Sequence, residues 1–171
     1  TTVHFKPDDT VFSETTYSFD TLAKRFRELA FLNKGVRIVL KEQAADREEV
    51  YFFEGGIASF TEYLTKGKNL LHPKPIYFKS DLTEDESEKL KSQLECAFQW
   101  TDSYNENLVS YVNNINTLEG GTHLTGAKSA LTRVLNQFAE ATGMLKNFKD
   151  GITGDDIREG LVGIISVKVK N

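Results

Sequence analysis

Residues 121–129, which read GTHLTGAKS, come closest to a site with recognisable chemistry. A strand, a glycine turn and a helix start are typical of a loop whose backbone amides and helix dipole hold phosphate groups. The spacing differs by one residue, because Ala127 stands where such a loop carries its lysine. One residue turns a helix position by about 100°, so Lys128 is expected to point away from a nucleotide on the loop. We interpret the segment as a tight strand-to-helix turn, and an autonomous nucleotide-binding domain is the alternative.

The histidines and the single cysteine form no nucleophile or metal-ligand pattern. His4, His72 and His123 fall in separate segments with no pair at metal-ligand spacing, so we predict no metal site. Cys96 alternates with apolar residues such as Phe98, which indicates a core residue rather than a reactive thiolate. One cysteine also excludes an internal disulfide and favours a reducing, cytoplasmic location.

Basic residues on the predicted long helix, Lys128 and Arg133, could contact a phosphate backbone together with Arg158. Two or three cations more often lie on a solvated face. The net charge of −4 and the pI near 5.5 argue against a dedicated nucleic-acid binder. They leave room for a local basic patch inside a larger assembly.

Hydrophobic spacing predicts the elements that position these residues. Helices are expected at 20–33, at 57–64, at 123–142 and after the capping-box-like residues 153–156. Strands are expected at 36–40, 50–53, 76–78, 94–100, 108–113 and 162–169, with a strand tail at 1–6. The strand 94–100 is predicted to form a hairpin with 108–113, and Thr122 to cap the long helix.

These elements interleave without a strict βαβ period, which predicts an α+β fold with a mostly antiparallel sheet and helices on one face. The chain has 171 residues, of which 39% are hydrophobic, and this suits one domain or two small ones. No apolar run reaches the ~18 residues that a membrane span needs, and the first residues do not form a signal peptide.

Residues 80–95 carry six acidic residues against two lysines. We interpret them as a solvated excursion between two strands, with a protein-binding surface as the alternative.

Several strings resemble the family formed by the B subunit of bacterial DNA gyrase and the ParE subunit of topoisomerase IV. They run in order along nearly the whole chain: RELAFLNKGVRIVL at 27–40, FFEGGI at 52–57, PIYF at 75–78, NNINTLEGGTHLTG at 113–126, ALTRVLN at 130–136 and GDDIREGLVGIISVKV at 154–169. The acidic stretch is longer than the turn expected there and resembles an insertion.

The resemblance implies that residues 1–51 are the end of a GHKL ATPase domain. Residues 52–171 are then a transducer domain with a left-handed βαβ crossover, as in domain 2 of a ribosomal protein, truncated before a Gln-Thr-Lys loop. The whole enzyme would be an ATP-hydrolysing type II topoisomerase that couples ATP binding and hydrolysis to DNA strand passage. Negative supercoiling by gyrase and decatenation by topoisomerase IV both stay open. The family's catalytic groups lie outside this chain, so we expect no catalytic residue and no ATP turnover here.

The resemblance also implies site residues and partners. Thr1 and Val3 match the ATP pocket, where the threonine helps to read the adenine edge. Lys128 matches a position facing the cavity that admits DNA. ATP and Mg²⁺ are implied for the whole enzyme and no ligand for this chain. The implied partners are the gyrase A subunit or ParC, double-stranded DNA and a second copy of the gyrase B protein, with no membrane. Movement is expected to pass through the packing of helix 20–33 against residues 52–64.

Overall fold

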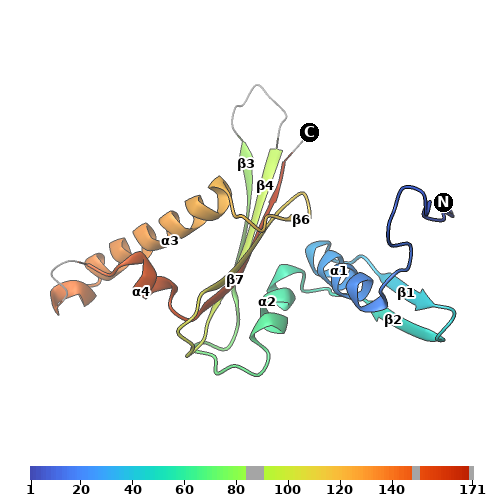
Figure 1. Ribbon diagram of the computed structural model, residues 1–171. Coiled ribbons are helices and arrows are strands. Elements are labelled where there is room, and N and C mark those ends of the chain that lie inside the picture. The colour runs from blue at the N-terminus through green and yellow to red at the C-terminus, as the bar shows by residue number, and fades with distance from the viewer. Residues whose placement is uncertain (84–90, 148–150, 170–171) are drawn as a thin grey trace.

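The computed structural model describes residues 1–83, 91–147 and 151–169. A small N-terminal unit, in which a helix packs on a two-stranded hairpin, lies beside a larger unit built on a five-stranded sheet (Figure 1). Much of the acidic stretch, residues 84–90, lies outside the described residues, so its role stays a prediction. Within the described ranges, no helix combines the length and the apolar character that a bilayer span requires.

The N-terminal unit contains α1 (Phe19–Leu32), β1 (Ile38–Glu42) and β2 (Arg47–Tyr51). The backbone N–H of Thr21 donates to the hydroxyl of Ser18, which caps α1. Phe19, Ala23, Ala30 and Tyr51 form the buried core between α1 and the hairpin. The predicted helix is therefore confirmed to within one residue, and the two predicted strands are each displaced by two to three residues. Residues 1–6, predicted as a strand tail, form no strand.

The larger sheet has the strand order β3-β4-β7-β5-β6. Its strands are β3 (Ile76–Thr83), β4 (Lys91–Trp100), β5 (Asn107–Val112), β6 (Ile115–Asn116) and β7 (Leu161–Lys168). Neighbouring strands are antiparallel except β5 and β7, which are parallel. The prediction of a mostly antiparallel sheet is thus confirmed for these strands.

The predicted hairpin between β4 and β5 is wrong, because β7 lies between them. Val162 of β7 stands opposite Gln99 of β4 on one side and opposite Asn107 of β5 on the other. The reason is apolar content: residues 161–166 are buried without interruption, so this strand takes the centre of the sheet. The polar residues 102–105 connect two strands that are not neighbours.

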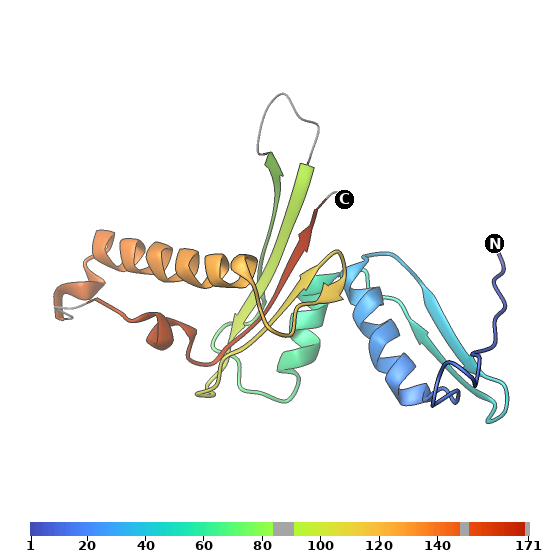
Figure 2. The same ribbon diagram turned by 45° about the horizontal axis from the view of Figure 1, so that its top comes forward.

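Helices cover both faces of the sheet, so the prediction of helices on one face is also wrong. These are α2 (Ile57–Thr65), α3 (Thr122–Ala141), α4 (Gly154–Arg158) and a 3₁₀ turn (Met144–Asn147). Ala97 and Ile164 pack against the α2 side, whereas their neighbours Cys96 and Ile165 pack against α3. Successive residues of a strand point to opposite faces, and Figure 2 shows the sheet between α2 and α3.

The helix starts follow two different rules. Thr153 and Asp156 form the capping box that was predicted for α4. Thr122 does not cap α3: it is the first helical residue, and Gly121 precedes it without a side-chain cap.

The apolar stripe of α3 is only half buried, with Val134 and Phe138 more than half exposed. An apolar groove of about 340 Å³ runs between α3 and strands β3 and β4.

Candidate functional site

The glycine turn before α3 is closed by a chain of side chains. His123 Nε2 lies 3.1 Å from Thr117 Oγ1, which lies 2.6 Å from the hydroxyl of Ser110 on β5. The imidazole also packs on Gly121, where an added Cβ would lie 3.0 Å from the ring. These contacts fasten the start of α3 to the sheet, which agrees with the interpretation as a strand-to-helix turn.

Lys128 belongs to an ion cluster made of Glu106, Lys128, Asp155 and Arg158. The ammonium of Lys128 pairs with one carboxylate oxygen of Glu106, and Arg158 Nε donates to the other at 2.8 Å. Arg158 also donates to Asp155 Oδ1 at 2.7 Å. The cluster links the segment before β5 with α3 and α4. Lys128 therefore has a carboxylate partner instead of facing the glycine turn, and Arg133 lies on the exposed surface of α3.

Thr1 and Val3 lie in the extended N-terminal segment, with Val3 78% exposed. In both views this segment and α3 are on opposite sides of the molecule (Figures 1 and 2), so the structure does not bring Thr1 and Val3 together with Lys128. The two residues do not by themselves enclose a nucleotide. Their place in an ATP pocket therefore stays a prediction.

The histidines and Cys96 are not brought together. His72 is fixed by main-chain groups: its Nε2 accepts from the N–H of Trp100 at 3.0 Å, and its Nδ1 lies 2.7 Å from the carbonyl of Lys74. Cys96 is 1% exposed and belongs to a buried apolar cluster, so it is confirmed as a core residue. This burial, with a smaller effect of Glu95, raises the pKa of its thiol to about 12. Over the described ranges, His, Cys, Asp and Glu side chains form no group of three or more that could hold a metal.

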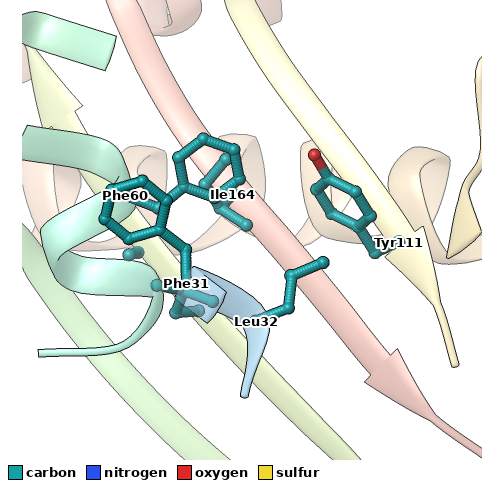
Figure 3. Packing of buried hydrophobic residues seen from close by; sticks show 7 residues of the cluster. Phe31, Leu32, Phe60, Tyr111 and Ile164 are labelled. Carbon is teal, nitrogen blue, oxygen red and sulfur yellow. The ribbon is translucent and has the colours of Figure 1, made fainter. Parts of the chain in front are cut away.

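The two units meet at an aromatic junction, defined as Phe31, Phe53 and Phe60. The ring of Phe31, at the end of α1, stacks on Phe53 with centroids 3.6 Å apart and on Phe60 of α2 with centroids 4.7 Å apart. Phe31, Leu32, Tyr111 and Ile164 belong to one buried cluster (Figure 3). The predicted packing of helix 20–33 against residues 52–64 is therefore present.

A polar contact stands beside this junction. Arg25 of α1 donates from Nη2 to the carbonyl of Asn114 at 2.8 Å, and Asn114 Nδ2 donates to Asn33 Oδ1 at 3.1 Å. Asn114 lies in the turn between β5 and β6. The N-terminal unit thus contacts the larger unit through aromatic rings and through hydrogen bonds, which include one from Arg27 to the hydroxyl of Tyr63 at 3.1 Å.

The sequence analysis did not identify Glu106 as a member of the ion cluster, nor Arg25 and Asn114 as contacts between the two units. Their partners are far away in the sequence. Glu106 and Lys128 are 22 positions apart, and Arg25 and Asn114 are 89 positions apart. A local signal existed for Asn114 only, because the pair Asn113-Asn114 is typical of a tight hairpin turn. The other two depend on the strand order, which the sequence pattern did not reveal.

A sequence model of the DNA gyrase B family matches residues 56–171. The DNA gyrase B protein of Clostridium acetobutylicum is 46% identical over 169 residues, which are 99% of this chain and 26% of that protein. The DNA topoisomerase 4 B protein of Bacillus subtilis is 45% identical over 169 residues, which are 99% of this chain and 25% of that protein. The chain spans about a quarter of the length of these curated relatives.

The fold is similar to the crystal structure of the 43K ATPase domain of Thermus thermophilus gyrase B in complex with an aminocoumarin. The TM-score is 0.82 at 38% sequence identity, and the match covers 98% of this chain and 44% of that chain. The similarity therefore extends over both the N-terminal unit and the five-stranded sheet.

Proposed function

This chain belongs to the DNA gyrase B family, and we propose that it is the part of a type II topoisomerase that transmits movement from an ATPase domain to DNA. In this proposal residues 1–51 complete the ATPase domain and residues 52–171 form the transducer. The left-handed crossover stays part of the proposal, which assigns it to the parallel strands β5 and β7 and the helix α3 between them in sequence. We propose gyrase as the enzyme, and topoisomerase IV is the second candidate because its B protein is nearly as similar.

The observation that carries the proposal is the aromatic junction. Phe31 is 2% exposed and is stacked between residues of the other unit. Packed interiors respond to displacement by switching between arrangements rather than by yielding gradually. Because Ile164 of the central strand belongs to the same buried cluster, a displacement of α1 acts directly on the sheet.

We propose that α3 carries the DNA-facing surface and that Lys128 contributes to it. Glu106 neutralises this lysine in the structure, so a DNA phosphate has to replace a carboxylate. Lysine supplies a point charge and not the bidentate fork of an arginine, so the contact is independent of DNA sequence. In the full-length protein, Lys128→Ala is expected to lower the salt dependence of DNA binding by roughly one phosphate contact.

ATP and Mg²⁺ belong to the proposed whole enzyme. We propose that this chain contributes Thr1 and Val3 to the ATP pocket of that enzyme. The 171-residue chain alone is expected to show no ATP turnover. The proposed partners are the gyrase A subunit or ParC, double-stranded DNA and a second copy of the gyrase B protein, in the cytoplasm. Phosphoryl transfer needs groups that position water and clamp the phosphates, and in this proposal those groups belong to other parts of the enzyme.

The proposal is tested with the full-length protein that contains this chain, its A-type partner and relaxed circular DNA. Phe53→Ala loosens the aromatic junction and is expected to lower the number of supercoils introduced per ATP hydrolysed. Tyr104→Ala removes an exposed aromatic side chain and is the matched control, expected to match the wild type. Loss of ATP hydrolysis and supercoiling in equal proportion would contradict a role in transmission.

Two further outcomes separate the alternatives. Decatenation without supercoiling would identify topoisomerase IV. ATP turnover by the isolated chain that disappears in Lys128→Ala would establish the autonomous nucleotide-binding domain and refute the proposal.

A further inference from the structure

The turn between β5 and β6 consists of Asn113 and Asn114, and we call it the asparagine turn. Both residues have positive φ, 48° and 65°, and Val112 stands opposite Ile115 across them. Asparagine tolerates this left-handed conformation better than other residues that carry a side chain. The two side chains are therefore presented on a rigid two-residue turn.

Asn114 contacts the N-terminal unit. The guanidinium of Arg25 donates to its main-chain carbonyl at 2.8 Å, and its side-chain Nδ2 donates to Asn33 Oδ1 at 3.1 Å. The Asn33 amide is itself oriented, because its Nδ2 donates to the carbonyl of Leu29 at 2.8 Å. The position of α1 thus determines where Asn114 finds its partners.

Asn113 contacts the end of the central strand. Its backbone N–H donates to the carbonyl of Val167 at 2.9 Å, and its side-chain Oδ1 accepts from the N–H of Val169, also at 2.9 Å. The second contact lies one residue beyond the end of β7 at Lys168. Adjacent residues of one turn therefore hold α1 on one side and the exit of β7 on the other.

The arrangement leaves one group unsatisfied. Asn114 Oδ1 is buried and has no hydrogen-bond partner among the described residues. A buried acceptor without a donor is costly relative to one that is paired. The guanidinium of Arg25 is rich in N–H donors and already contacts the carbonyl of this residue.

We propose that the asparagine turn is the polar link that transmits the position of α1 to the end of β7, with Arg25, Asn114 and Asn113 as positioning residues. This inference rests on the proposed function, in which α1 and the sheet move relative to each other. In this proposal α1 moves about the aromatic junction, and the asparagine turn responds to the direction in which α1 moves. At the β7 end, the link acts on Val169, the residue after the strand.

The test is amide hydrogen exchange of the 171-residue chain, without ATP or DNA. The reporters are the amides of Asn113 and Val169. Arg25→Met removes the hydrogen bond from α1 to the carbonyl of Asn114, together with the ion pair to Glu28. Exchange at both reporters is expected to become roughly 2- to 30-fold faster, the range expected of coupled sites. Asn114→Gly keeps the positive φ, removes the link to Asn33, and is expected to act in the same direction.

Two variants complete the design. Asn113→Gly removes the acceptor of the Val169 amide and sets the maximum effect at that reporter. Arg47→Met breaks ion pairs with Asp20 and Glu49 and the contact of its guanidinium with the Phe19 ring, all within the N-terminal unit, and is expected to leave both reporters unchanged. Unchanged exchange in Arg25→Met and Asn114→Gly, or equal acceleration by Arg47→Met, would overturn the inference. The exchange rates are measured without enzyme activity, so they do not depend on the outcome of the supercoiling test. The proposed function and this inference can therefore fail separately.

Discussion

Phe31 and Phe53 stack with ring centroids 3.6 Å apart and ring planes 14° apart, although Phe31 ends the helix of one unit and Phe53 precedes the helix of the other. Packing the two rings together removes apolar surface from water, which stabilises the contact. The same Phe31 ring stacks on Phe60 with planes 3° apart. This one side chain thus joins the N-terminal unit to the sheet.

Phe31→Ala is expected to lower the free energy of unfolding by about 3–5 kcal/mol, because it removes a buried ring and leaves a cavity. Urea unfolding of the 171-residue chain, followed by circular dichroism, measures the change. Tyr104→Ala is the matched aromatic control at an 84% exposed position and should stay within about 0.5 kcal/mol of the wild type. A loss below about 1 kcal/mol for Phe31→Ala would mean that the two units hardly depend on this contact.

Gly163→Ala is expected to destabilise the sheet, because a Cβ there would lie 2.5 Å from Phe98 Cδ1 and 2.9 Å from the carbonyl of Ala97. Such overpacking typically costs about 1–3 kcal/mol. Gly126→Ala is the control: it lies inside α3 with nothing within 4 Å, and it should stabilise the chain by up to about 1 kcal/mol. Thermal unfolding of both variants checks the opposite signs, and equal shifts would refute the packing of β7 against β4.

The sequence pattern predicted the helices well because the apolar spacing that identifies a helix lies within its own residues, and two of the four α-helices that the structure describes also carry a side-chain cap. Ser18 and the Thr153–Asp156 box act within one turn of their own helices. Strand order has no such signal, and the predicted pairing of β4 with β5 failed because β7, 49 or more residues further along, competes for the same edge. The unbroken burial of residues 161–166 was the available clue to a central strand covered on both faces. The partner of Lys128 was hidden for the same reason, since Glu106 reaches it only once β5 lies beside β7.

The free energy of unfolding is expected to fall as the pH rises from 9.0 to 12. Burial raises the pKa of Cys96 from 9.0 to about 12, so the unfolded chain loses this proton first. The stability that the neutral thiol contributes is complete below pH 9.0 and is lost at about 1.4 kcal/mol per pH unit above it. Burial also raises the pKa of Tyr111, which acts in the same direction.

Urea titrations at pH 8, 9, 10 and 11 measure this dependence. Cys96→Ala removes the thiol and should flatten the slope between pH 9 and 10, where tyrosine contributes less. An identical slope in the variant would show that the thiol is not protected by the fold. Iodoacetamide at pH 8 should likewise label Cys96 only after unfolding.

The ion cluster allows a comparison of two carboxylates that share Arg158. Glu106 is 27% exposed and binds both Lys128 and Arg158, whereas Asp155 is 97% exposed and binds Arg158 alone. An exposed ion pair contributes little, because water and salt screen it, so Asp155→Asn is expected to change the free energy of unfolding by less than about 0.5 kcal/mol. Glu106→Gln leaves two cations without their shared partner and is expected to cost about 1–3 kcal/mol. Urea unfolding at low and high salt measures both, and equal effects would show that the cluster does not hold α3 and α4 to the sheet.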